Sequence, residues 1–387
     1  MGADSDWPTT ARIAVVGHGL TAYACVAALA QLGYGCDLLF DLNRFDLART
    51  DFRGPPLVLN DVGKSLLAVL FPDVDFCAPL CYPLSHRWVR WGARTEAELV
   101  YQPALALRSR TLLTLLQHSD CIQRTAIIDA SQLTAAQVTQ SYDWIIYASP
   151  QQAALVAPTP ACSFVGGQRT MIVAEIVAQP PAVPTSQPAC YIESLKDGWL
   201  FYAPCDCQGA TLQLCLPAVP DPPRRALLES VYQSMLIGPL VNDLQTVQCF
   251  ASAPRLQWPL CGPGWLRVGE AAIKLDPVSG EGTPFALRSA ILAAATIDAV
   301  LRNSVVQESH QVIPHDAALN HYQSRLAQSF LAHLQGCVKF YQDAFRLHPA
   351  WCDEMNLMVD AGAALSAQVQ NTTDNWRYRL VGFELRA

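Results

Sequence analysis

Basic charge is scarce in this sequence. The 387 residues include 26 lysines and arginines against 33 aspartates and glutamates, for a net charge of −7. Only four of the basic residues are lysines: Lys64, Lys196, Lys274 and Lys339. A protein that binds a phosphate backbone presents a basic face or a block of basic residues, and neither can be recognised here. The sequence therefore argues against nucleic acid as a partner.

Long apolar runs and metal-type cysteine spacings are also missing. No apolar run reaches the roughly 18 residues expected of a membrane span. The fourteen cysteines include two close pairs, Cys77/Cys81 and Cys205/Cys207, but neither is followed by a second pair at zinc-site spacing. No secretory leader precedes the first strand-like run, which favours reduced thiols and a cytoplasmic protein. We expect no bound metal and no membrane span.

The first informative motif is a strand followed by a glycine turn. The β-branched run 12–16 leads into Gly-His-Gly-Leu-Thr-Ala, and an alanine-rich amphipathic stretch follows. Gly17 permits a tight turn, Gly19 lets the backbone approach a pyrophosphate, and Ala22 lets the helix pack closely on the strand. The free N–H groups at the N-terminus of the helix would attract the phosphates.

A second apolar run ends at Asp41, about 20 residues after the glycine turn, where a carboxylate can bind ribose hydroxyls. The order of strand, turn, helix, strand and acid predicts dinucleotide binding. It does not distinguish FAD from NAD, and a glycine-rich turn in an ordinary α/β domain is the alternative.

The second motif lies far along the chain. A strand-like run from Gly264 ends in Gly-Glu-Ala-Ala, followed by Asp-Pro, by Gly-Glu-Gly and by a helix-patterned stretch, Phe285–Leu301. This order resembles the second FAD fingerprint of the flavoprotein monooxygenase, halogenase and geranylgeranyl-reductase superfamily. The resemblance implies bound FAD. The implied contact residues are Gly269, Glu270, Asp276, Pro277, Gly280 and Gly282. The family has aspartate where this chain has Glu270, whose side chain is one methylene longer.

Two shorter segments carry the same resemblance. Leu-Arg-Ser-Arg-Thr-Leu, residues 107–112, resembles the family's Arg-x-x-Leu helix start, which implies that Arg110 lies near the cofactor; a surface arginine is the alternative. Residues 143–149 resemble the strand that returns to the FAD domain, with Ala148 near its end and Pro150 in place of the usual glycine.

These motifs predict an α/β fold with a discontinuous, Rossmann-like FAD-binding domain, a β-sheet substrate domain and a helical C-terminal region. The FAD-binding domain is expected over 8–50, 100–160 and 255–300, the substrate domain over 51–99 and 161–254, and the helical region over 301–387. Within the last region, His315–Leu347 has apolar residues at three-to-four spacing.

The resemblance leaves several activities open. They are monooxygenation through a flavin C4a-hydroperoxide, halogenation, and the hydride chemistry of isoprenoid-type reductases and dehydrogenases. Halogenases carry a W-x-W-x-I-P motif and a reactive lysine. Here Trp199 opens Trp-Leu-Phe-Tyr-Ala-Pro, and the candidate lysine, Lys64, lies in a helix-patterned run where a solvated side chain is the alternative. A flavin-binding partner protein is the non-enzyme alternative.

The C-terminal stretch favours monooxygenation. Residues 340–351 resemble the "F-Y-x-x-E-x-R-W" ending of flavoproteins that modify a tryptophan of a partner polypeptide during tryptophylquinone biogenesis; a packed amphipathic helix is the alternative. The sequence therefore predicts an FAD-dependent monooxygenase that hydroxylates an electron-rich aromatic. The substrate would be a small molecule or a tryptophan or indole of a peptide or protein. O₂ would be consumed, with NAD(P)H or a separate flavin reductase as electron source.

A hydroxylase of this kind needs a dry pocket and a base near the substrate ring. The candidate base is His86, in a segment expected to face the flavin; a structural or surface histidine is the alternative. Trp88, Trp91 and Trp199 are candidates to line the pocket or to fill the core.

Overall fold

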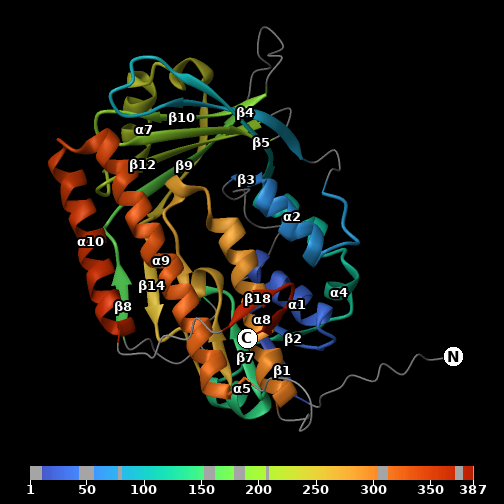
Figure 1. Ribbon diagram of the computed structural model, residues 1–387. Coiled ribbons are helices and arrows are strands. Elements are labelled where there is room, and N and C mark those ends of the chain that lie inside the picture. Colours follow the sequence, from blue (N-terminus) through green and yellow to red (C-terminus); the bar gives the residue numbers. More distant parts are fainter. Residues whose placement is uncertain are drawn as a thin grey trace.

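The computed structural model describes residues 11–42, 56–76, 81–151, 162–177, 188–205, 209–303, 313–370 and 378–386. Cys77 and Cys207, each one half of a close cysteine pair, lie outside these residues. Figure 1 shows two main layers of strands, with the N-terminal strands in the lower layer and a second sheet at the top. Helices α8, α9 and α10 stand between and beside the two layers.

The lower layer is a six-stranded, mainly parallel sheet. Its order is β15 (Cys261–Gly262), β16 (Trp265–Arg267), β7 (Trp144–Tyr147), β1 (Ile13–Val16), β2 (Asp37–Phe40) and β6 (Ala126–Asp129). Only the β15–β16 pair is antiparallel. The strands come from three distant parts of the sequence, and each part falls inside one of the predicted FAD-binding segments.

Two apolar helices cover this sheet. Helix α1 (Leu20–Gln31) is buried at every residue from Ala22 to Leu29, and it packs against α8 (Gly282–Asn303). Small alanine side chains allow this close approach. Among the described residues, α8 is the one helix long and apolar enough to span a membrane, and 78% of its apolar window is buried inside the protein. Figure 1 shows α8 in the middle of the molecule.

The upper layer is an eight-stranded, mainly antiparallel sheet. Its order is β13 (Leu244–Ala251), β9 (Thr170–Val177), β12 (Gly209–Leu216), β11 (Trp199–Pro204), β10 (Ala189–Ser194), β4 (Tyr82–Arg90), β5 (Glu98–Arg108) and β3 (Pro56–Asn60). Only β10 and β4 run parallel. One face packs on α7 (Pro223–Gln233) through an apolar cluster that includes Leu200, Tyr202 and Leu227. Trp199 belongs instead to the large central core.

The C-terminal helices connect the two layers. Helix α9 (His315–Phe345) contacts β15 of the lower sheet, and near its other end Tyr341 contacts Trp199 of the upper sheet. Helix α10 (Pro349–Gln370) packs along α9.

The other described helices are α2 (Asp61–Leu70), α3 (Ser109–Leu116), α4 (Asp120–Gln123) and α5 (Ala135–Ser141). There are three described 3₁₀ turns, η1 (Gly238–Leu240), η2 (Gly269–Ala271) and η3 (Pro277–Ser279). A small sheet consists of β17 (Ile273–Lys274), β14 (Arg255–Trp258) and β8 (Cys162–Val165), and a hairpin consists of β18 (Arg379–Val381) and β19 (Glu384–Arg386).

The predicted fold class is confirmed, and the structure adds two details. Strand β5 continues to Arg108 within the upper sheet, whereas the predicted FAD-binding segment already begins at residue 100. The C-terminal region is not helical throughout, because β18 and β19 form a hairpin that packs on α8 through buried Leu385. The division into domains by residue range stays a prediction.

Candidate functional site

The loops that follow β1, β7 and β16 lie at one edge of the parallel sheet. Gly17 N–H donates to Leu39 O at 2.8 Å, and Ala148 N–H donates to Val16 O at 2.9 Å. Val268 N–H donates to Tyr147 O, also at 2.9 Å. Ligands of open α/β sheets bind outside this carboxyl edge. The structure therefore brings the two glycine-rich motifs and the segment around Ala148 to a single edge.

The first two glycines of the N-terminal motif have different surroundings. Gly17 has φ of +139°, and a Cβ there would lie 2.7 Å from the Cβ of Ser149, so this glycine permits close packing within the protein. Gly19 has φ of +121°, and a Cβ there would meet nothing within 4 Å. The space above Gly19 is therefore open to a ligand.

The N-terminus of α1 offers backbone donors to that space. Within the described part of the chain, the N–H groups of Leu20, Thr21 and Ala22 have no acceptor, and the helix has neither a side-chain cap nor an acidic residue in its first turn. Free N–H groups and the positive end of the helix dipole attract anions. The arrangement suits a pyrophosphate.

The second motif meets the first at Gly269. A Cβ on Gly269 would lie 2.5 Å from Thr21 Oγ1, so η2 and the start of α1 are in direct contact. Gly269 N–H donates to Ser289 Oγ of α8 at 3.1 Å. The next residue, Glu270, is exposed. Asp41 is buried directly after β2, at the same edge of the sheet.

We call residues 276–282 the Asp-Pro loop. Almost all the backbone N–H groups of this loop donate hydrogen bonds within the protein. Asp276 N–H donates to His333 Nε2, and burial lowers the pKa of His333, which favours the neutral, accepting ring. The N–H groups of residues 278–281 donate to acceptors within the loop itself. Among the described contacts, this leaves the N–H groups of Gly282 and Thr283, at the start of α8, without an acceptor.

The open side of the Asp-Pro loop is lined by glycine. A Cβ on Gly280 or on Gly282 would meet nothing within 4 Å, and both residues are exposed. Gly280 has φ of +65°, the left-handed conformation that ends η3. Pro277 occupies the first position of that turn. A flat ligand can therefore approach the backbone here, beside the positive end of α8.

The Asp276 side chain does not face this open space. It is 1% exposed, and its Oδ2 lies 2.9 Å from Nη2 of Arg169. Tyr341 donates its hydroxyl to Oδ1 at 2.9 Å, and Val278 N–H donates to the same oxygen at 3.0 Å. The resemblance implied that Asp276 contacts the cofactor, but its carboxylate is bound within the protein.

Arg110 is the second residue of α3, and its side chain is half-buried. Helix α3 lies beside α1, because Gln117 at its C-terminal end donates to Tyr23 Oη at 3.1 Å. The neighbouring Arg108 is instead bound to Glu175 of the upper sheet at 2.9 Å, with both side chains buried. A role for Arg110 beside the cofactor stays a prediction.

His86 lies on the wrong face of the upper sheet for the predicted role. It is in register with Ala189 and Tyr101, and its ring contacts that of Tyr101, which is 72% exposed. Trp88 is in register with Tyr191, which packs on the cluster beneath α7, whereas Trp199 of the neighbouring strand points to the opposite face. The expectation that His86 faces the cofactor loops is therefore not supported.

The other aromatic and lysine candidates have clear surroundings. Trp91 and Trp199 lie in the core, with ring centroids 6.5 Å apart, and the ring of Trp91 also contacts that of Phe340 in a tilted arrangement with centroids 4.4 Å apart. Lys64 forms an ion pair with Asp61 one turn away at 2.6 Å. Lys274 donates to Ala251 O at 2.7 Å, and burial lowers its pKa.

His18, between the two N-terminal glycines, was not singled out by the sequence analysis. Its Nε2 lies 2.9 Å from Tyr23 Oη, and its ring contacts Phe40 at the end of β2. Burial lowers the pKa of His18 to about 4, so the ring is neutral near pH 7. The feature of the sequence that could have identified His18 is its position between Gly17 and Gly19.

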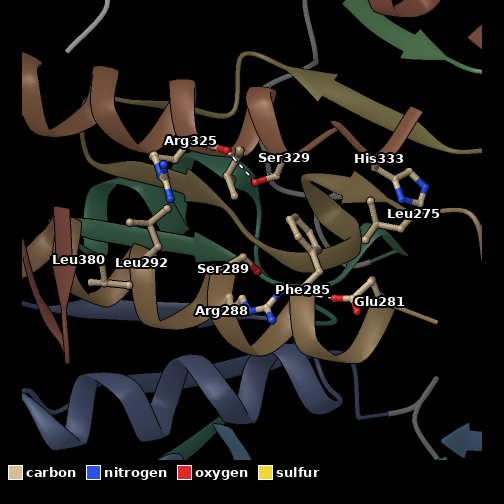
Figure 2. A pocket seen from close by; sticks show the side chains of 11 residues that line it. Leu275, Glu281, Phe285, Arg288, Ser289, Leu292, Arg325, Ser329, His333 and Leu380 are labelled. Atoms are coloured by element: carbon tan, nitrogen blue, oxygen red, sulfur yellow. Dashed lines mark hydrogen bonds and ion pairs between the residues drawn. The ribbon is translucent and has the colours of Figure 1, made fainter. Parts of the chain in front are cut away.

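A separate cavity of about 370 Å³ lies between α8 and α9. Its walls are Leu275, Glu281, Phe285, Arg288, Ser289, Leu292, Arg325, Leu326, Ser329, His333 and Leu380. Figure 2 shows α8 between this cavity and the blue helix α1. Glu281 and Arg288 pair with each other at 3.4 Å, so their opposite charges lie together in the lining.

No family model matches this chain, and no curated protein matches it in sequence. Its fold is similar to several solved structures. One is QhpG, a peptidyl tryptophan dihydroxylase essential for tryptophylquinone cofactor biogenesis, with TM-score 0.68, 21% identity and coverage of 89% of this chain and 79% of that one. Another is CmlS, a flavin-dependent halogenase, with TM-score 0.69, 14% identity and coverage of 94% and 72%.

A third similar structure is 2,6-dihydroxypyridine-3-hydroxylase from Arthrobacter nicotinovorans, with TM-score 0.62, 15% identity and coverage of 89% of this chain and 96% of that one. These identities are low, so the likeness concerns the fold. The chain has the fold shared by flavin-dependent hydroxylases and halogenases, as the sequence motifs predicted.

Proposed function

We propose that this chain is an FAD-dependent monooxygenase that hydroxylates an electron-rich aromatic. The observation that carries the proposal is the contact between Gly269 and Thr21, which brings the two glycine-rich motifs together at one edge of the parallel sheet. We call the open space at Gly19, Gly280 and Gly282 the crevice. A nicotinamide dinucleotide needs only the first motif. A second motif that ends at a helix N-terminus suits a cofactor that extends further, as FAD does.

The described residues fit FAD. The free N–H groups at the start of α1 would hold the pyrophosphate. Asp41 and exposed Glu270 would bind hydroxyls of the ribose and of the ribityl chain. The free N–H groups of Gly282 and Thr283 would face the ring and favour negative charge on it. When bound and reduced, FAD supplies electrons for the activation of O₂.

We further propose that the substrate is a tryptophan or indole of a peptide or protein. The support is the likeness in fold to QhpG, a peptidyl tryptophan dihydroxylase, together with the aromatic C-terminal stretch of α9. NAD(P)H or a separate flavin reductase would reduce the cofactor. A cytoplasmic location is proposed because the twelve cysteines among the described residues are free thiols. No base is proposed at His86.

Cofactor content tests the two-ended site. Gly19→Val and Gly282→Val each place a side chain in open space beside the crevice, and both variants are expected to purify without FAD. Gly35→Val is the matched control for Gly282→Val, because a Cβ at Gly35 also meets nothing within 4 Å but lies away from the loops. Gly382→Val, in the turn between β18 and β19, is the control for Gly19→Val, because Gly382 has φ of +61° and a Cβ there also meets nothing within 4 Å. The two-ended site is wrong if either crevice variant keeps full FAD occupancy.

Isotope incorporation tests the activity. The protein is reduced anaerobically and mixed with ¹⁸O₂ and a tryptophan-containing peptide, and ¹⁸O in the peptide is expected by mass spectrometry. Release of all the oxygen as hydrogen peroxide with every aromatic offered would refute monooxygenation. Bromide in a parallel sample tests the halogenase alternative, which has less support because Lys64 is paired with Asp61.

A further inference from the structure

A buried charge network lies behind the Asp-Pro loop, on the side away from the crevice. Its centre is Arg169, whose side chain is fully buried. Nη2 of Arg169 lies 2.9 Å from Oδ2 of Asp276, and Nη1 lies 2.6 Å from Oε2 of Glu354 on α10. Nη2 also donates to Gly166 O at 3.0 Å. One guanidinium thus ties the loop to the C-terminal helices and to the segment before β9.

Tyr341 supplies the second attachment. It is fully buried on α9, and its hydroxyl donates to Asp276 Oδ1 at 2.9 Å. Trp199 Nε1 of the upper sheet lies 3.4 Å from the same hydroxyl. The Tyr341 hydroxyl therefore lies between Trp199 of the upper sheet and the Asp276 carboxylate, to which it donates.

The Asp276 carboxylate also holds the backbone of the loop. Oδ1 of Asp276 accepts from Val278 N–H at 3.0 Å and caps η3, the turn that precedes Gly280. A buried carboxylate that lost Arg169 or Tyr341 would be left partly unpaired, and it would move toward water to regain partners. The loop meets solvent at exposed Gly280 and Gly282.

We propose that Arg169 and Tyr341 are positioning residues: by holding the Asp276 carboxylate away from the crevice, they set the geometry in which Gly282 and Thr283 present their N–H groups to the flavin ring. The inference rests on the proposed function for the identity of the ligand. Neither residue contacts the crevice, so their effect on the cofactor is transmitted through the loop. The affinity and the reduction potential of the flavin are therefore controlled partly from the upper sheet and the C-terminal helices.

Three variants test the proposal: Tyr341→Phe, Arg169→Lys and Arg169→Met. Arg90→Met is the control, because Arg90 pairs with the buried carboxylate of Glu193 at 2.6 Å on the α7 side of the same sheet. Hydrogen exchange of the loop amides is measured in the apoprotein. The FAD dissociation constant and the midpoint potential are measured in the loaded protein.

Tyr341→Phe is expected to weaken FAD binding by about tenfold, the effect of losing one hydrogen bond to a charged group. It should also speed amide exchange of residues 278–280 and shift the midpoint potential. Arg169→Lys should retain more affinity than Arg169→Met. Arg90→Met should lower the melting temperature and leave the loop exchange, the affinity and the potential unchanged.

Loop exchange and FAD affinity within about twofold of the wild type in Tyr341→Phe would overturn the inference, as would equal changes in Arg90→Met. If Arg169→Met does not fold, Tyr341→Phe still decides the outcome. If the wild-type protein binds no FAD, the proposed function fails, and the exchange rates of the apoprotein alone decide whether Arg169 and Tyr341 position the loop.

Discussion

Gly269 and Thr21 are in contact, although they belong to glycine-rich motifs about 250 residues apart in the sequence, near opposite ends of the proposed FAD-binding segments. A Cβ on Gly269 would lie 2.5 Å from Thr21 Oγ1 and 2.6 Å from Thr21 Cγ2. Gly269 also has φ of +56°, a conformation that favours glycine. The crevice therefore depends on the absence of a side chain at this one position.

Gly269→Ala should destabilise the protein and weaken FAD binding. The left-handed backbone alone costs a non-glycine residue about 1–2 kcal/mol, and the clash with Thr21 adds to it. Thr21→Ala removes the two closest atoms, so the double variant should recover part of the loss. Chemical denaturation of the four proteins measures the coupling, and strictly additive effects would show that the contact is unimportant.

Glu270 is expected to act on the cofactor and not on stability. The residue is exposed, so Glu270→Ala should leave the denaturation midpoint of the apoprotein unchanged. FAD binding should weaken by about three- to tenfold, because a charge-assisted hydrogen bond is lost. Glu270→Asp should bind FAD at least as well as the alanine variant. The control is Glu229→Ala, which removes an exposed ion pair on α7; equal FAD affinity in all four proteins contradicts the assigned contact.

His18 predicts a loss of stability in mild acid. Burial lowers its pKa to about 4 from the ordinary 6.5. Between these pH values His18 is protonated in the unfolded chain and neutral in the folded protein. Stability therefore falls as the pH drops from 6.5 to about 4, by roughly 2 kcal/mol at pH 5. His18→Gln should remove this part of the pH dependence. Denaturation at pH 7.5 and pH 5 measures it, and an unchanged slope in the variant would assign the effect elsewhere.

The far end of α8 provides a prediction on stability alone. Tyr34 donates its hydroxyl to Asp298 Oδ1 at 2.9 Å, and Asp298 is 3% exposed. Tyr34→Phe leaves that oxygen with Arg302 as its remaining partner and should destabilise the protein by about 1–2 kcal/mol. FAD affinity should not change, since the contact is at the other end of the helix. Tyr232→Phe, at a side chain 91% exposed, should have no effect on either quantity.

The parts of the site that the sequence predicted are local in sequence. Gly17, Gly19 and Gly282 are proposed to act through the backbone at their own positions, so the spacing of the glycines in the sequence is enough to predict them. The ends of α8 and α9 were also close to the predicted stretches, because apolar periodicity marks a packed helix.

The partners of Asp276 could not be predicted, because Arg169 and Tyr341 approach it through tertiary packing from separate parts of the chain, and Glu354 on α10 holds Arg169 from a third. The prediction that His86 faces the cofactor was not supported for a different reason. The register of β4 shifts between Leu84 and His86, and such an irregularity changes which face a side chain occupies.

The arrangement of the parallel sheet also bears on how the protein is made. Strand β16 completes one side of that sheet next to β7, and α8 covers α1. Both elements come from residues 265–303, so the crevice has only its N-terminal wall until that part of the chain has left the ribosome. The upper sheet, complete by residue 251, can form earlier. During synthesis, loading of the nucleotide would therefore follow the folding of the sheet that is proposed to receive the substrate.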